Sequence, residues 1–436
     1  MHANHTPTRR PVNHLTRRTL LKSAAAAAGA AAGSGAITGF PTIWAQEIKN
    51  IVLHHAGPPV SAIPAIAAQA TKDLGFTIQM QATENADLLN RFLSQSSNID
   101  CADVAFTFQR YLVGRNVLQA VPVAKFKNWD VTIPLFTKGV YSDGREASRQ
   151  GTAPFTVLYA TGPDGQKFSA EPSDYLTGAP TITNADTLGV RPDLVKRPVT
   201  SWADLISPDF KGRAALQDQS TVGIIDVAMA MEASGQVKYR DKGNMTRAEI
   251  DQTIGTMMKI KSEGQFRSFW TTFDQSVNLM ASGEVVIQSM WSPAVTAVKT
   301  RGIPCVFQPL KEGYRGWGYS LGVMKHVTGM KLDAFYDYMN WYTGGFPGAF
   351  IAREGYYSPQ PTNAKKYLTQ AEWDYWYAGK PAATDIMNPF GKVMEKAGRS
   401  RDGGSFEQRM GHIAVWNSVM DEDRYLTRRW NEFITS

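Results

Sequence analysis

Side chains that could bind a small molecule follow several apolar runs of this sequence, at the point where each run ends. Aromatic faces attract alkylammonium groups by about 0.5 to 2 kcal/mol each, and carboxylates and imidazoles supply charge and hydrogen bonds. In open α/β sheets, ligand pockets form at the carboxyl ends of the strands, in the loops that lead into helices. The candidates at such positions are His54 and His55 after "NIVL", Thr107 and Phe108 after "CADVAF", Asp218 after "RAALQ", and Trp291 after "VVIQSM".

Trp291 stands in the stretch "GEVVIQSMWSPAV". The pattern predicts that Gly283 ends a helix and that Val285 to Ile287 lie in a sheet. It also predicts that Ser292 and Pro293 open the next helix, as its cap and its first residue. This arrangement places Trp291 at a strand end, where it would face the expected pocket.

Other candidates have structural alternatives. Trp270, in "FWTTFDQS" before another helix, could line the pocket or pack in the core. Adjacent His54 and His55 would point to opposite faces of a strand, so at most one of them lines a pocket. A structural imidazole is the expectation for the other.

The N-terminus carries the pattern of an export signal. "TRRTLLK" precedes the small-residue run "SAAAAAGAAAGSGAITG" and a cleavage-like "PTIWA". The paired Arg17 and Arg18, with the weak hydrophobicity of the run, indicate the twin-arginine translocase. We expect cleavage of residues 1–45 after Ala45. We also expect release into the periplasm without a lipid anchor, because no cysteine lies near this site.

Removal of the signal changes the charge of the protein. The whole chain has 46 basic and 39 acidic residues, a formal charge of +7. Five of the basic residues and none of the acidic residues precede residue 46, which leaves 41 against 39, or +2. The basic character belongs mostly to the discarded segment, so we expect no nucleic-acid partner.

Motifs of catalytic or metal chemistry are scarce. No Gly-rich dinucleotide loop follows the first strand, and no HExxH zinc motif is present. The only cysteines, Cys101 and Cys305, lack metal or redox spacing. They could pair in an exported protein, but we expect two buried small hydrophobes. We therefore expect no catalytic residue, no cofactor and no bound metal, with a cofactor-bearing periplasmic enzyme as an alternative.

Strand-like and helix-like runs alternate along the first part of the chain, which predicts βαβ units with parallel strands. Residues 125–180 are rich in Gly, Pro, Ser and Thr and predict an irregular surface insertion. Thr246 and Glu249 have capping-box spacing and predict a helix start. After "GYSLGVMK" the chain is expected to be mostly helical, and the length suits two domains.

Several blocks of the sequence resemble a known family. In order, they are "TSWADLISPDFKG", "MASGEVVIQSMWSPAVTAVK", "GIPCVFQPLKEG" with "WGYSLGVMK", and "REGYYSPQPTN". They are similar to the periplasmic solute-binding proteins of bacterial ABC importers, the family 1 extracellular solute-binding proteins. The branch that binds spermidine and putrescine is the most similar.

The resemblance implies a two-lobed α/β fold of the type II periplasmic-binding-protein class, with crossover strands near 183–190 and 317–323. Lobe 1 would hold 46–183 and about 318–375, and lobe 2 would hold 184–317 and about 376–436. The protein would be a monomer that closes on a small solute, polyamine-like or another organic amine or polar solute. It would deliver this solute to an ABC permease and its ATPase in the inner membrane.

The resemblance also implies site residues. Trp291 and Trp317 match positions where an aromatic ring contacts the ligand. Tyr319 and Val222 stand where polyamine binders carry carboxylates, while Asp218 lies one position from a third and Asp186 could substitute for one.

The loss of two carboxylates argues against an unmodified polyamine, because a buried unpaired ammonium costs several kcal/mol. A monocation, a neutral solute, or an anion held by His55, backbone amides and Arg353 remains open. The pair Tyr356 and Tyr357 is similar to the tyrosine pair of ferric-iron binders, so iron binding is a further alternative, and Tyr357 is a candidate site residue.

Overall fold

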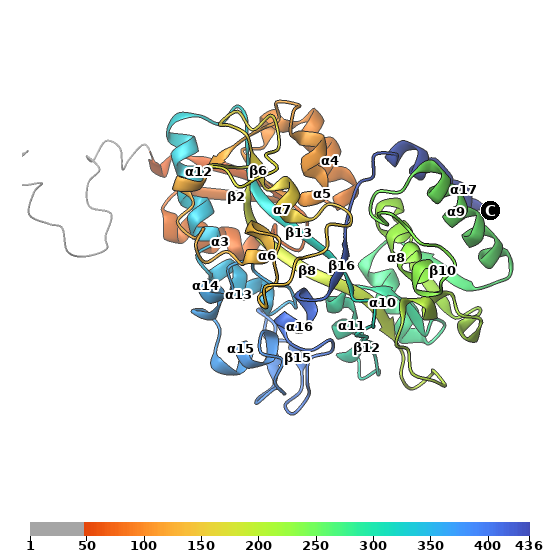
Figure 1. Ribbon diagram of the computed structural model, residues 1–436. Helices are drawn as coiled ribbons and strands as arrows, with labels where there is room; N and C mark the ends of the chain where they lie inside the picture. The colour runs from red at the N-terminus through yellow and green to blue at the C-terminus, as the bar shows by residue number, and fades with distance from the viewer. Residues whose placement is uncertain (1–47) are drawn as a thin grey trace, which may run out of the picture. The chain divides into compact units, whose positions relative to one another are not determined.

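Two long strands, β8 (Ala179–Val190) and β13 (Tyr314–Met324), pair antiparallel in the middle of the main sheet (Figure 1). The computed structural model describes residues 48–436, and Val52–Ser436 forms one compact unit. The expected signal peptide with its cleavage after Ala45 lies outside the described residues. Across the sheet lie β10 (Phe266–Trp270), β9 (Ala214–Gln217), β11 (Ile287–Met290), β8, β13, β3 (Cys101–Ala105), β1 (Val52–Gly57) and β2 (Thr77–Ala82).

Parallel strands flank the central pair on both sides. On one side β1 pairs in parallel with β2 and β3, connected through α3 (Pro64–Leu74) and α4 (Asn85–Ser94). On the other side β9 pairs in parallel with β10 and β11. The prediction of βαβ units is therefore confirmed, and the antiparallel central pair makes the sheet mixed. Short strands extend it: β12 (Val306–Phe307) pairs with β8, while β4 (Leu118–Gln119) and β16 (Ile413–Trp416) pair with β13.

The remaining elements are mostly helices. They are α5 (Phe106–Leu112), α6 (Pro134–Thr137), α7 (Pro154–Val157), α8 (Ser220–Ala233), α9 (Arg247–Ser262), α10 (Phe273–Ser282), α11 (Ser292–Lys299), α12 (Gly329–Tyr342), α13 (Phe346–Ala352), α14 (Pro361–Lys365), α15 (Gln370–Trp376), α16 (Phe406–Met410) and α17 (Asp423–Thr435). The expected helical C-terminal region is interrupted after α15 by a hairpin of β14 (Ile386–Met387) and β15 (Val393–Glu395). Helix α17 buries Leu426, Trp430 and Phe433 and lies beside α9 (Figure 1).

The helix signals around Trp291 are largely confirmed. Gly283 ends α10 with a left-handed φ of 79°, which a glycine adopts without strain. The N-cap of α11 is Trp291 itself, in an extended conformation and without a side-chain cap, so the prediction that Ser292 is the cap was wrong by one residue. The predicted strand residues Val285 to Ile287 are only partly confirmed, because β11 begins at Ile287. The backbone passes directly from β11 through Trp291 into α11. Thr246 and Glu249 form the predicted capping box of α9.

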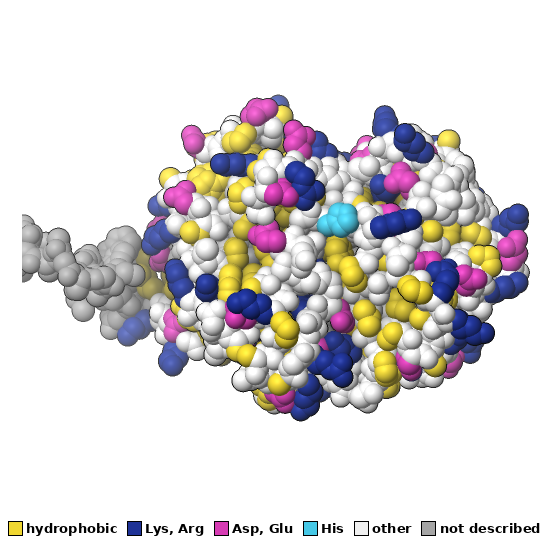
Figure 2. Space-filling view, turned by 60° about the horizontal axis from the view of Figure 1, so that its bottom comes forward, with side chains coloured by type: hydrophobic (Ala, Val, Ile, Leu, Met, Phe, Trp, Pro, Cys, Tyr) yellow, Lys and Arg dark blue, Asp and Glu magenta, His cyan; other side chains and the backbone are white. Residues whose placement is uncertain are grey.

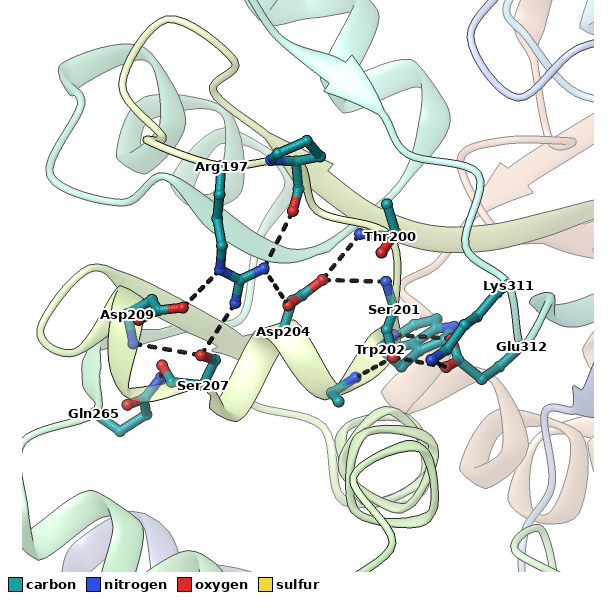
Figure 3. A network of polar contacts seen from close by, with 12 residues as sticks. Arg197, Thr200, Ser201, Trp202, Asp204, Ser207, Asp209, Gln265, Lys311 and Glu312 are labelled. Atoms are coloured by element: carbon teal, nitrogen blue, oxygen red, sulfur yellow. Dashed lines mark hydrogen bonds and ion pairs between the residues drawn. The ribbon is translucent and has the colours of Figure 1, made fainter.

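A polar network fixes the start of β13 to the short helix η4 (Trp202–Ile206), as Figure 3 shows. Asp204 accepts the backbone N–H groups of Thr200 and Ser201 at 2.9 and 3.1 Å, and it accepts Arg197 Nη1 at 2.7 Å. Glu312 accepts Ser201 Oγ at 2.6 Å and the backbone N–H of Trp202 at 3.0 Å. These bonds satisfy the free N–H groups of the first helical turn and connect it to the residues that precede β13.

Residues 125–180 are irregular, as predicted, but they are not a mere surface decoration. They contain the short helices α6 and α7 and a small sheet of β6 (Tyr159–Ala160) and β7 (Tyr175–Leu176) with β5 (Val121–Pro122). Phe136 and Leu158 are fully buried, and the Phe136 ring contacts Phe106 and Trp416. Proline and glycine prevent long regular elements here, while the apolar residues still reach the core.

The cysteines and the surface agree with the sequence analysis. Cys101 and Cys305 are buried and unpaired. Within residues 48–436, no helix combines the length and the apolar character needed to cross a membrane. On the face in view in Figure 2, basic and acidic side chains are interspersed.

Candidate functional site

A cavity of about 880 Å³ lies at the carboxyl ends of the parallel strands on both sides of β8 and β13. Its wall takes residues from the loops after β1, β2 and β3 and from the loops after β9, β10 and β11. This is the position expected for a ligand site in an α/β sheet. Its volume lies in the range of sites for small molecules.

Five of the predicted site residues line this cavity. They are Phe108, Asp186, Trp291, Trp317 and Tyr319. Thr107 and Val222 line it as well. The structure therefore brings together side chains from five separate parts of the sequence, and their contact with a ligand remains a prediction.

One aromatic group surrounds Trp291. The Trp291 ring stacks on Phe273, with centroids 6.3 Å apart and planes at 15°. It meets the buried Trp270 ring edge-on, with centroids 5.0 Å apart. Trp270 itself does not line the cavity and is fully buried. Of the two predictions for Trp270, core packing is therefore favoured over a place in the cavity wall. The buried Trp270 ring packs against Trp291 and helps to orient it.

A second aromatic group lies on β13. Trp317 contacts Tyr319 and Tyr356 edge-on, with centroid distances of 5.7 and 5.9 Å. Trp317 Nε1 donates to Asp186 Oδ2 at 2.9 Å, which fixes the orientation of the indole. Edge-on packing of this kind leaves ring faces suited to cations or apolar groups.

A buried charged group lies at the base of the cavity, on the two central strands and α8. Arg315 Nε donates to Asp226 Oδ1 at 2.7 Å and Nη1 donates to Asn417 Oδ1 at 2.6 Å, while Nη2 lies 3.5 Å from Asp186 Oδ2. Burial, with a smaller contribution from Asp226, raises the pKa of Asp186 to about 6, although Arg315 opposes the shift. Burial also raises the pKa of Asp226. Arg315 is thus already engaged by two carboxylates.

Four buried polar atoms of lining residues have no hydrogen-bond partner within residues 48–436. They are Thr107 Oγ1, Asp186 Oδ1, Gln217 Oε1 and Glu354 Oε1. The amide oxygen of Gln217 can only accept hydrogen bonds. The oxygens of Asp186 and Glu354 can only accept them when their carboxyl groups are ionised. Burial raises the pKa of Glu354, because no nearby cation offsets the loss of hydration. A ligand with N–H donors would satisfy these acceptors.

Three other predicted site residues lie away from the cavity wall. His55 is fully buried, with Nδ1 2.8 Å from Tyr338 Oη and Nε2 2.9 Å from Asp103 Oδ2. Asp218 accepts Trp430 Nε1 at 2.9 Å. Tyr357 is fully buried, and its hydroxyl accepts a hydrogen bond from Arg401 Nη1. Each of these side chains has a structural partner. His54 instead contacts Asp100, with its Nδ1 3.0 Å from Asp100 Oδ2.

Several lining residues were missed by the sequence analysis. Glu354 follows helix α13, Phe390 lies in the β14–β15 hairpin, and Gln217 is the last residue of β9. The strand-end rule could have identified Gln217, one position before Asp218. Glu354 and Phe390 follow no strand of the main sheet, so no signal of that kind marks them.

Two observations bear on the enzyme and iron alternatives. The sequence does contain one G-x-S-x-G pattern, Gly318 to Gly322, which the sequence analysis overlooked. Ser320 lies within β13, is fully buried and accepts Gln109 Nε2 at 3.0 Å, whereas a nucleophile of that motif needs an exposed strand-to-helix turn. No cluster of three or more His, Cys, Asp or Glu side chains in the described part of the chain could hold a metal ion.

Comparisons with known proteins agree with this geometry. The family described as bacterial extracellular solute-binding protein matches residues 65–346. The spermidine/putrescine-binding periplasmic protein of Escherichia coli (strain K12) is 29% identical over 235 residues, 50% of this chain and 64% of that protein. The present chain thus matches somewhat less than two thirds of that relative's length.

Solved structures share the fold at low identity. The substrate-binding protein of a spermidine/putrescine ABC transporter from Streptococcus pneumoniae matches with a TM-score of 0.57 and 13% identity, over 88% of this chain and 97% of that one. A GABA receptor matches with a TM-score of 0.58 and 17% identity, over 88% and 98% of the two chains. These matches confirm the predicted two-lobed α/β fold.

Proposed function

Because the chain belongs to the bacterial extracellular solute-binding proteins, we propose that it is the substrate-binding component of an ABC importer that captures an organic amine. The family implies an exported protein. The observation that carries the ligand class is the set of buried acceptor oxygens, Asp186 Oδ1, Gln217 Oε1 and Glu354 Oε1, beside the Trp291 and Trp317 rings. An ammonium group supplies both the donors and the charge that this surface needs.

The charges of the cavity wall support a cation. Glu84, Asp186 and Glu354 are its acidic residues, and Arg315 is its basic residue. Arg315 is held by Asp226, Asn417 and Asp186, so it has little capacity left for an anionic ligand. Glu354 and Asp186 can take the role of the carboxylates missing at Tyr319 and Val222, which removes the main objection to a diamine or polyamine.

An anionic ligand was expected to be held by His55 and Arg353, but both side chains are bound to other residues. His55 is buried against Asp103 and Tyr338. Arg353 donates from Nε and Nη2 to the two carboxylate oxygens of Glu372 at 2.5 and 2.9 Å, a bidentate pair. Neither side chain lines the cavity.

Three of the ligands named for the relatives share this chemistry. Spermidine, putrescine and GABA each carry a primary amine that is protonated at neutral pH. We therefore expect a ligand with at least one alkylammonium group.

Domain closure would couple binding to delivery. The central strands β8 and β13 contain both predicted crossovers, so lobe 1 would hold 46–183 with about 318–375 and lobe 2 would hold 184–317 with about 376–436. Ligand contacts from both lobes would stabilise the closed state, which the permease and its ATPase would then recognise. No catalytic step is required, and the protein would work as a monomer.

Export would use the twin-arginine translocase and release the protein into the periplasm. Replacement of both Arg17 and Arg18 by lysine should retain the precursor in the cytoplasm, as fractionation and immunoblotting would show. Export of the double variant at the wild-type rate would instead assign the signal to the general route.

A thermal-shift screen of the mature protein tests the ligand class. The panel contains putrescine, spermidine, GABA, neutral sugars, and dicarboxylates without an amine. We expect the melting temperature to rise with at least one amine and to stay unchanged with the sugars and dicarboxylates. A rise with a dicarboxylate or sugar, and with no amine, would refute the amine proposal while leaving the family unaffected.

A further inference from the structure

The cavity wall combines buried polar side chains with exposed aromatic side chains. Asp186, Gln217 and Arg315 line it and are at most 3% exposed. Phe273 and Phe390 also line it, yet they are 37% and 70% exposed. The buried part of the wall thus includes a charged and polar group, and the part that meets solvent includes two phenylalanine rings. A ligand that fits both parts has a charged end and an apolar end.

Phe390 is the most exposed large hydrophobic side chain of residues 48–436. Its ring meets Phe350 of α13 edge-on, with centroids 5.9 Å apart, and Phe350 lines the same cavity. Covering an exposed phenylalanine with a ligand or a partner is favourable, because it removes apolar surface from water. Since the Phe390 ring lies at the cavity wall, a ligand in the cavity is placed to cover it.

The loop that carries Phe390 is held in a defined conformation. Asn388 Oδ1 accepts the backbone N–H groups of Phe390 and Lys392 at 3.0 and 2.9 Å, and Gly391 adopts a φ of 77° that favours glycine. The position of the Phe390 ring at the mouth is therefore built into the tip of the hairpin.

The base of the same hairpin is tied to the helix that begins at Trp291. Lys299, the last residue of α11, forms ion pairs with Glu395 of β15 and with Asp402. The hairpin thus reaches from α11 at its base to Phe350 of α13 at its tip. Both helices contribute to the cavity wall, with Pro293 from α11 and Phe350 from α13.

We propose that Phe390 and Phe273 form an apolar subsite at the mouth, and that the ligand is an amine with an aryl or long alkyl group. This inference rests on the proposed function, because the ammonium occupies the polar base. Phe273 lies within residues 65–346 that match the family, and the hairpin with Phe390 lies beyond them. Phe273 stacks on Trp291, which makes the apolar surface continuous from the mouth inward.

Titration calorimetry with phenethylamine and ethylamine separates the two parts of the cavity, because these amines share the ammonium and differ by one phenyl ring. We expect the wild-type protein to bind phenethylamine at least tenfold more tightly than ethylamine. In Phe390→Ala this preference should fall to threefold or less, with ethylamine affinity within twofold of wild type. Phe390→Leu should retain part of the preference.

Tyr367→Ala is the matched control. Tyr367 is 50% exposed and aromatic, and it does not line the cavity, so its removal should leave the preference unchanged. Unchanged phenethylamine binding in Phe390→Ala would overturn the subsite and assign the exposed ring to a partner surface. Binding of putrescine but not of phenethylamine would overturn it too, while the proposed function stands. Failure of every amine, including those of the thermal-shift panel, would remove both proposals.

Discussion

Trp317 donates its indole N–H to the Asp186 carboxylate at 2.9 Å, across the two central strands of the sheet. The bond joins an aromatic ring of the cavity wall to a carboxylate whose second oxygen, Oδ1, has no partner within residues 48–436. One side of the carboxylate thus orients the ring, and the other is available to a ligand donor. This relationship gives the site its expected pH dependence.

Amine affinity should increase as the pH rises through about 6. The pKa of Asp186 is about 6, raised by burial and by Asp226 and opposed by Arg315 and Arg409. An ammonium binds the ionised carboxylate, so protonation below this pH weakens binding. Calorimetry between about pH 5 and pH 8 should show this rise in the wild type, and a smaller rise with weaker binding in Asp186→Asn, where only Glu354 remains to titrate. An identical profile in the variant would exclude Asp186 as the titrating group.

The stability of the ligand-free protein should respond to pH in the opposite direction. The pKa of Asp186 in the folded state is about 6, above its ordinary value of 3.8, so the folded state binds the proton more tightly than the unfolded state does. This contribution to stability is lost as the pH rises through about 6. The melting temperature of the wild type, measured relative to Asp186→Asn, should fall over this interval. A rise would contradict the assignment.

Trp291→Ala should weaken amine binding at least tenfold, about 1.4 kcal/mol, with the fold intact. The ring is partly exposed at the cavity, and its neighbours Trp270 and Phe273 would remain. Trp291→Phe, which keeps an aromatic face, should lose less. Thermal shifts with the ligand compare the three proteins. Equal shifts in wild type and Trp291→Ala would show that the ring only packs in the core.

Glu354→Gln should weaken amine binding about tenfold or more, because it removes a charge whose oxygen Oε1 is buried and unpartnered in the described residues. Folding stability should not fall, since burial already disfavours the ionised form and raises the pKa. Calorimetry and urea denaturation measure the two effects. Glu263→Gln, outside the cavity wall, is the control, and equal affinities in both variants would exclude Glu354 from the site.

Asp204→Ala should lower the free energy of unfolding by about 1 to 3 kcal/mol without a change in ligand affinity. Its carboxylate accepts two backbone N–H groups of the η4 start and one Arg197 N–H (Figure 3). Asp209→Ala, which removes an exposed partner of the same Arg197, should cost less. Urea denaturation compares the variants. Equal losses would mean that the ion pair, not the cap, is what stabilises this segment.

Much of the fold could be predicted from the sequence because the local signals agree with one another. Strand and helix runs alternate, Thr246 marks the start of one helix and Gly283 the end of another, and Trp291 follows a buried strand. The contribution of residues 125–180 to the core could not be predicted. Phe136 and Leu158 are fully buried, but they stand among turn residues without hydrophobic periodicity.

The site was harder to predict, because a strand end does not fix which way a side chain points. The rule found Phe108 and Trp291, which line the cavity. It also selected His55 and Asp218, which bind Asp103 and Trp430 instead. These partners are distant in the sequence and become neighbours only in the folded protein. Glu354 reaches the cavity from a loop after a helix. Such tertiary placement leaves no pattern in a single sequence.

The central claim is that the cavity binds a protonated amine. Its most direct test is titration calorimetry of the mature wild-type protein, near neutral pH, with the amine that gives the largest thermal shift and with the fully N-acetylated form of that amine. Acetylation removes the charge and keeps the carbon skeleton. We predict one binding site for the amine and at least a hundredfold weaker binding of the acetylated compound. Equal affinity for the two compounds would contradict the claim.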